Sequence, residues 1–253
     1  MSIQGQSFTS SFAGGSHVDF GVGTGGLADL FKSDYTIAVL EKGVSNTRGL
    51  LGSYSDTGAA SHLGDFFLSN NSGGRMFGSN DFSTGYPDPA SVPASPLIGD
   101  TWGWKTQSKA TGAAHFKFGY SVLSTGAWSL GETGSPANHN DNATTAVMLS
   151  TFCIYPNGFN SQDIAAIVAW PTQLSDADIM ASCTQALADI FVVSDPIWII
   201  SFEEANAGSA VVDLTGNGAD ETARQFIVTS ADPPDFDFSL GSSYDTTQFF
   251  AFL

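Results

Sequence analysis

The chain has 253 residues, of which only 13% are charged, and its 8 basic and 25 acidic residues give a formal net charge of −17. A surface this acidic repels phosphate backbones, which argues against nucleic acids as partners. A hydrophobic content of 42%, with 20 Phe and 28 Gly, favours a turn-rich β protein over a disordered chain.

The N-terminus and the apolar runs bear on localisation. Residues 1–7 have neither the basic head nor the apolar core of a secretion signal. No apolar run is long enough to span a membrane. We therefore expect a protein that is made in a cytoplasm and is not inserted into a membrane.

The first part of the chain predicts a series of strands. Residues 7–22 alternate apolar and small polar residues around Gly14-Gly15, which predicts a hairpin. The glycine-rich segment 21–26 has the spacing of a phosphate-binding loop. Because no βαβ pattern surrounds it and no basic residue lies within it, we expect a flexible loop. Further strands are predicted at 35–40, 47–54, 62–68 and 73–78.

The middle of the chain alternates loops and strands. Residues 83–100 contain four prolines and little periodicity, which predicts a long exposed loop. Strands follow at 100–105, 115–123 and 126–130, then a polar loop at 131–142 and a strand or a bent pair at 146–155. In the strand 115–123 an aromatic face alternates with His115, Lys117, Gly119 and Ser121, so we expect one wet face.

The most informative stretch runs from 163 to 180. Residues 164–170 form an apolar run of strand length, and Pro171 ends it because proline lacks a backbone donor. Ser175 is typical of an N-cap, followed by Asp176 and Asp178 in the first helical turn. We expect the helix to continue towards Ile190, with an apolar face made by Ile179, Cys183, Ala186, Leu187 and Ile190.

These residues carry a resemblance. The stretch 163–180 resembles the closing strand and helix of concanavalin A-like jelly-roll domains of the laminin G type. Residues 35–40 (Tyr-Thr-Ile-Ala-Val-Leu) are similar to a strand near the start of such domains, with Leu40 where an aromatic usually stands. Asp213-Leu-Thr-Gly-Asn-Gly resembles their opening turn, here near the C-terminus. The resemblance implies an all-β antiparallel sandwich with one short helix near 175–190.

The composition changes after the helix, so we divide the chain into a sandwich domain, 1–190, and a C-terminal β extension or small tail domain, 191–253. Strands are predicted at 196–202 and 210–214. The tail either folds back to complete the sandwich or forms a separate β unit, and we favour a semi-independent tail. The segment 232–238 (Asp-Pro-Pro-Asp-Phe-Asp-Phe) is similar to tails of structural proteins from bacteriophages that infect actinobacteria.

The search for catalytic chemistry is negative. None of the five glutamates begins the alternating carboxylate motif of laminarinase-type glycosidases, no G-x-S-x-G elbow is present, and the four histidines lack zinc-ligand spacing. We therefore predict a protein that is not an enzyme and that has no catalytic residue and no cofactor. For Cys153 and Cys183, two buried free thiols are favoured over a disulfide.

Calcium is the most reasonable metal, since laminin G-like domains often hold one with loop oxygens. Asp213, Thr215, Asn217 and Gly218 match the opening of an EF-hand loop, but Arg224 stands where a bidentate Glu is needed. The loop 138–142 is a second candidate. An Asx-type turn and a solvated hairpin tip are the alternative interpretations of the two segments.

Candidate glycan contacts combine aromatic platforms with polar side chains. Trp102 and Trp104 lie on one face of a predicted strand beside the 83–100 loop, and Asn138, Asn140 and Asp141 belong to the following polar loop. Tryptophans at this spacing also commonly fill a sandwich core, and we favour that interpretation.

Three functions remain. The first is a non-enzymatic structural protein of a bacteriophage virion, either a capsid decoration or a minor tail protein. It would be present in many copies and contact other virion proteins through the 83–100 loop and the 191–253 tail. The second is a carbohydrate-binding module for host adhesion on the same particle. The third, a divergent glycosidase, needs a carboxylate pair that the sequence does not show.

Overall fold

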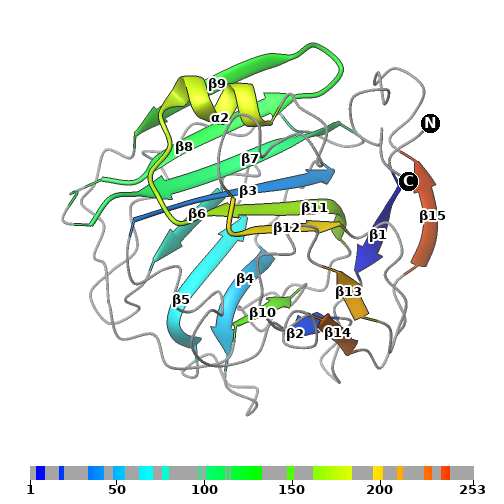
Figure 1. Ribbon diagram of the computed structural model, residues 1–253. Helices are drawn as coiled ribbons and strands as arrows, with labels where there is room; N and C mark the ends of the chain where they lie inside the picture. Colours follow the sequence, from blue (N-terminus) through cyan, green and yellow to red (C-terminus); the bar gives the residue numbers. More distant parts are fainter. Residues whose placement is uncertain are drawn as a thin grey trace.

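The computed structural model is an antiparallel β-sandwich with a short helix on one sheet (Figure 1). The structure describes backbone and side chains for residues 34–42, 97, 101–111, 113, 115–132, 163–183, 196–197 and 199, and the backbone alone for the other strand residues. All strand pairs in this part of the chain are antiparallel. The predicted all-β sandwich with one short helix is confirmed.

The first sheet has eight strands in the order β15-β1-β11-β3-β7-β8-β9, and β12 also pairs with β11. Its strands are β1 (Gln4–Phe8), β3 (Tyr35–Lys42), β7 (Trp102–Lys109), β8 (Lys117–Val122), β9 (Ala127–Glu132), β11 (Gln162–Trp170), β12 (Trp198–Ser201) and β15 (Asp235–Ser239).

The second sheet has seven strands in the order β13-β14-β2-β10-β4-β5-β6. Its strands are β2 (His17–Asp19), β4 (Arg48–Tyr54), β5 (Leu63–Asn70), β6 (Met76–Ser79), β10 (Val147–Ser150), β13 (Ala210–Val212) and β14 (Gln225–Thr229).

The centre of the first sheet is buried on both faces. Residues 35–41 of β3 and 164–170 of β11 are all buried, and the two strands pair along most of their length. A strand covered on both faces tolerates apolar residues at every position, which explains the unbroken apolar run 164–170.

Helix α2 (Asp176–Ser182) confirms the predicted N-terminus. Ser175 is the N-cap, with Asp176 and Asp178 in the first turn. The predicted length is wrong, because the helix ends at Ser182 and Cys183 is its C-cap. Ala186, Leu187 and Ile190 lie outside the described residues. No helix in the described part of the chain is long and apolar enough to cross a membrane.

The predicted hairpin at 7–22 is wrong. Both of its strands exist, but β1 pairs with β11 and β15, whereas β2 pairs with β10 and β14 of the other sheet. Local alternation identifies a strand, but the sheet that the strand joins depends on partners far away in the sequence.

The predicted wet face of β8 is also wrong for two of its positions. Gly119 and Ser121 are buried. A Cβ on Gly119 would lie 2.6 Å from Leu130 Cδ2 and 3.5 Å from Trp128 Cζ3. The side chains of these two β9 residues therefore pack against the glycine and bury it. The hydroxyl of Ser121 accepts a hydrogen bond from the Trp104 backbone N–H at 3.1 Å. This bond offsets the cost of burying a polar side chain.

Leu97 corrects part of the predicted exposed loop at 83–100. It is buried, and its Cδ2 lies 2.4 Å from where a Cβ on Gly103 would stand. This leucine therefore packs against the glycine of β7. The other residues of the segment lie outside the part that the structure describes.

The C-terminal segment contributes strands to both sheets. β12 pairs with β11 and β15 with β1 in the first sheet, and β14 pairs with β2 in the second. These strands complete the sandwich, which is the folded-back alternative and not the separate β unit that we favoured. The boundary at residue 190 stays a prediction.

Candidate functional site

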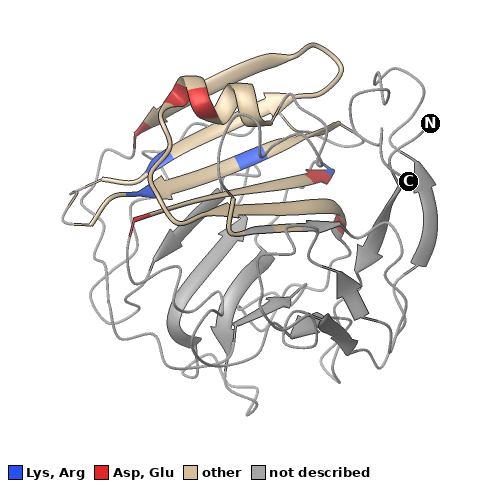
Figure 2. Cartoon of the chain, in the orientation of Figure 1, with Lys and Arg blue, Asp and Glu red and all other residues tan. Residues whose placement is uncertain are grey.

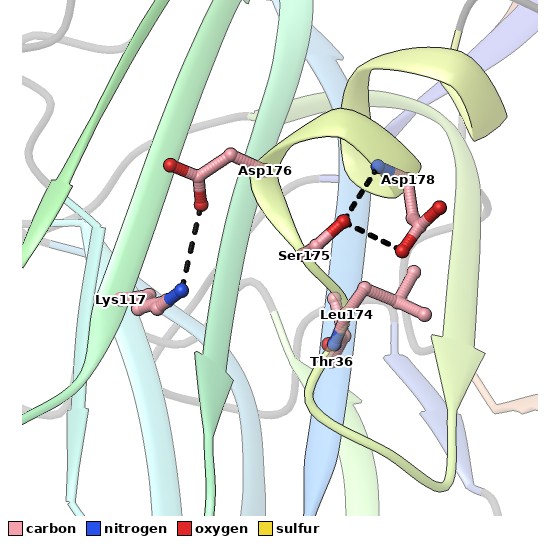
Figure 3. Close-up of polar contacts among 6 residues, drawn as sticks. All are labelled: Thr36, Lys117, Leu174, Ser175, Asp176 and Asp178. Atoms are coloured by element: carbon pink, nitrogen blue, oxygen red, sulfur yellow. Dashed lines mark hydrogen bonds and ion pairs between the residues drawn. The ribbon is translucent and has the colours of Figure 1, made fainter.

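The segment before helix α2 is fixed to the first sheet by one threonine. Thr36 of β3 donates its hydroxyl hydrogen to the Thr172 carbonyl at 2.8 Å. The same hydroxyl accepts a hydrogen bond from the Leu174 backbone N–H at 2.9 Å, and Figure 3 draws these two residues. The chain therefore turns back after Pro171, and α2 packs on the face of the first sheet that carries Leu40 and Trp104.

Polar contacts at the start of α2 hold the helix in this place. Ser175 Oγ accepts from the Asp178 backbone N–H at 3.2 Å and donates to Asp178 Oδ2 at 2.6 Å. Asp176 Oδ1 lies 3.7 Å from Lys117 Nζ of β8, as Figure 3 shows. The hydroxyl thus satisfies a backbone donor of the first turn, and the ion pair links the helix to the sheet.

The two tryptophans predicted as glycan contacts lie under and beside this helix. Trp104 is 0% exposed and belongs to the apolar cluster that includes Leu174, Ile179 and Cys183. Trp102 is half-buried and packs against the same cluster. Trp104 therefore has no surface to offer a ligand and fits the core interpretation, whereas Trp102 keeps part of its surface.

Trp128 was not among the predicted contacts. It lies on β9 opposite Ser121, is half-buried and packs against the same cluster as Trp102. The two-residue alternation in 126–130 predicts that Trp128 and Leu130 share a face. Only the strand register shows that this face is the one that carries Trp102.

The other predicted site residues cannot be placed. Asn138, Asn140 and Asp141 lie outside the described residues, as do Asp213, Thr215, Asn217 and Gly218 of the calcium candidate. Within the described ranges, no group of three or more His, Cys, Asp or Glu side chains is arranged to hold a metal ion.

The opposite face of the sheet holds buried charges that the sequence analysis did not single out. Glu41 of β3 and Lys105 of β7 form an ion pair, and both side chains are 0% exposed. Lys109 donates to the Ala110 and Ala113 carbonyls, and its Nζ lies 5.6 Å from the centre of the Phe116 ring. These contacts compensate for the burial of the two lysine side chains in β7.

The described lysines are all engaged in contacts within the chain. Lys42 lies 3.5 Å from Asp163, and the other three make the contacts given above. Figure 2 shows these charges on the strands of the first sheet and the carboxylates of α2 beside them. Because each lysine already has a partner, the described surface offers little positive charge to an anionic ligand.

The Tyr35 phenol and the Cys183 thiol are both buried, and burial keeps them protonated. Burial raises the pKa of the Cys183 thiol and the pKa of the Tyr35 phenol. Cys183 is a free buried thiol, as favoured from the sequence, and Cys153 lies outside the described residues. A protonated buried thiol is a poor nucleophile, so Cys183 acts as a small apolar core residue.

Comparisons with known proteins add a weak likeness. No protein-family model and no curated protein matches the chain. Among solved structures, the chain is similar to the CBM40 of a Ruminococcus gnavus IT-sialidase bound to α2,3 sialyllactose, with 16% identity and a TM-score of 0.41 over 72% of this chain and 99% of that one. The same module bound to α2,6 sialyllactose gives 15% identity, a TM-score of 0.39, and 72% and 98% coverage. Likeness at this level says nothing about a ligand of this chain.

Proposed function

We propose that this chain is a non-enzymatic structural protein of a bacteriophage virion, built on a lectin-like sandwich. One observation carries the proposal. The strands that contain the laminin G-like residues, β3 and β11, lie in the same sheet as β15, which contains most of the phage-like segment 232–238, and β1 joins β11 to β15. The two resemblances therefore describe a single folded body and support a single function for it.

The proposal includes the place and the partners of the protein. It is made in the host cytoplasm and then incorporated into the virion, as a capsid decoration or minor tail protein in many copies. Of the C-terminal segment, the strands β12, β14 and β15 are built into the two sheets. We therefore assign the contacts with other virion proteins to exposed edges of the sandwich.

The positions of two glutamates support a non-enzymatic role. Glu41 is buried on β3, and Glu132 is exposed on β9, three strand positions away. Three strand spacings correspond to about 14 Å. Glycoside hydrolysis needs two carboxyl groups within about 5–9.5 Å. These two side chains are too far apart to act as such a pair, and the ion pair with Lys105 already occupies Glu41.

The second candidate is a carbohydrate-binding module for host adhesion. It is favoured by Trp102 and Trp128, which are half-buried and pack against the same cluster on the helix side of the sheet. Tryptophan rings held in place by a core supply rigid apolar surface to a ligand. A glycan array with the full-length protein tests this role, and loss of binding in Trp128→Ala would support it.

The experiment for the main proposal is mass spectrometry of purified phage particles from the source of the sequence. We expect peptides of this chain at a stoichiometry of several copies per particle. Its absence from every particle would overturn the virion assignment. A turnover assay on polysaccharides tests the non-enzymatic role separately, and sustained release of reducing ends would contradict it.

A further inference from the structure

Among the strands that the structure describes, β9 is the last one at its end of the first sheet. Its inner edge pairs with β8 over six residues, and no strand that the structure describes pairs with its outer edge. In Figure 1, β9 lies at the margin of the molecule beside α2. Such an edge presents a row of N–H and C=O groups that can accept an additional strand.

The side chains of β9 give this edge a distinct pattern. Trp128 and Leu130 are half-buried on the helix side of the sheet, where they lie opposite Ser121 and Gly119 of β8. Glu132 follows on the same side and is exposed. At a period of two residues, the edge therefore offers two apolar positions followed by one acidic position.

The acidic position is available to a partner. Glu132 lies opposite Lys117 on β8, but the Lys117 ammonium is 3.7 Å from Asp176 of α2 and so already has a carboxylate beside it. A basic side chain on an added strand would lie directly opposite Glu132. Opposite charges in a cross-strand pair stabilise strand association, and like charges destabilise it.

We propose that the outer edge of β9 binds an extended segment of another protein by antiparallel strand addition, and that this segment has the pattern basic–x–apolar–x–apolar. The basic residue lies opposite Glu132, and the two apolar residues lie opposite Leu130 and Trp128, in that order along the added strand. The antiparallel direction follows that of the described strand pairs. The inference rests on the proposed function, because it gives the chemistry of the virion partner.

Charge decides between this partner and a second copy of the chain. Each copy carries a formal net charge of −17, so two copies brought edge to edge would repel each other. A basic segment from a different protein is instead attracted to this surface. The added strand would also cover the part of Trp128 and Leu130 that is still exposed, which adds apolar burial to the backbone hydrogen bonds.

The test uses the full-length protein and two synthetic peptides. The probe is the capped heptapeptide Thr-Lys-Thr-Val-Thr-Val-Thr, and the control peptide has Glu in place of Lys. By isothermal titration calorimetry, we expect the Lys peptide to bind about fivefold more tightly than the Glu peptide. By hydrogen exchange, we expect the peptide to protect amides within 127–132.

A charge exchange makes the test specific. Glu132→Lys should reverse the preference, so that the Glu peptide binds more tightly than the Lys peptide. The control is Ala177→Lys, which adds a positive charge at an exposed position on α2 and should keep the wild-type preference. Circular dichroism checks that both variants are folded.

Three results would overturn the inference: no binding of either peptide at millimolar concentration, an unchanged preference in Glu132→Lys, or protection confined to segments other than 127–132. These outcomes are separate from those of the proposed function. If the peptides fail but particles contain the chain, only this inference falls. If the peptides bind but the chain is absent from particles, the virion assignment falls.

Discussion

Glu41 and Lys105 lie diagonally across strands β3 and β7 and form an ion pair from which solvent is excluded. Both side chains are 0% exposed. Glu41 lies directly opposite Gly103 in the register of the two strands, and Lys105 is the next residue on that face of β7. Two charges removed from water stabilise each other only as a pair, so each side chain depends on the other.

Removing one partner of this pair should destabilise the protein strongly. Lys105→Met leaves the Glu41 carboxylate buried without its cation, and we expect the free energy of unfolding to fall by about 3–5 kcal/mol. Urea denaturation measures this loss. The double variant Glu41→Leu/Lys105→Met should recover most of it, because an apolar pair needs no compensating charge. A single variant that loses less than about 1 kcal/mol would contradict this account.

The Thr36 hydroxyl should contribute more to the free energy of unfolding than its small size indicates. It makes two hydrogen bonds that hold the segment before α2. Thr36→Val keeps the shape but removes both bonds and leaves the Leu174 N–H and the Thr172 carbonyl without this partner, so we expect a loss of about 1–3 kcal/mol. Thr36→Ser is the matched control because it keeps the hydroxyl. Equal losses in the two variants, measured by thermal unfolding, would argue against the hydrogen bonds as the cause.

Gly103 should not tolerate even one added methyl group. A Cβ at this position would lie 1.9 Å from the Ser121 carbonyl oxygen, which belongs to the backbone and cannot rotate away. We expect Gly103→Ala to destabilise the protein by about 3 kcal/mol or more. Gly126→Ala is the comparison, since Gly126 has a positive φ of 65° but no heavy atom within 4 Å of the added Cβ. For Gly126→Ala we expect the free energy of unfolding to fall by about 1–2 kcal/mol, because only the left-handed backbone conformation is unfavourable for alanine.

The C-terminal strands should be required for folding. A chain that ends at residue 190 lacks β12, β14 and β15, so β11, β1 and β2 each lose a pairing partner. Exposed strand edges promote aggregation. We expect the shortened chain to aggregate when it is expressed, as measured by size-exclusion chromatography. A soluble monomer with the circular dichroism spectrum of a β protein would instead support an independent domain at 1–190.

Much of the local structure could be predicted from the sequence. The end of β11 at Trp170, the break at Pro171 and the cap at Ser175 depend on residues a few positions apart, and all three are confirmed. Sheet membership depends on distant partners, so the alternation around Phe8 and Val18 predicted strands correctly but wrongly placed them in one hairpin.

The site was harder to predict than the fold for the same reason. Trp102 and Trp104 are two residues apart on one strand face, yet only Trp104 is completely buried, because the apolar cluster beneath α2 covers it. Trp128 joins the same surface from β9 through a register that spans two strand pairs. The Glu41–Lys105 pair links residues 64 positions apart, and no local pattern indicates that it is buried.

The virion assignment is tested most directly by cryo-electron microscopy of particles from the source of this sequence. The account predicts density for the two-sheet sandwich at a defined and repeated position, with an extended segment of a neighbouring protein along the outer edge of β9. Many symmetric copies on the shell would identify a capsid decoration, and a few copies on the tail would identify a minor tail protein. Particles without this sandwich at any position would contradict the central claim.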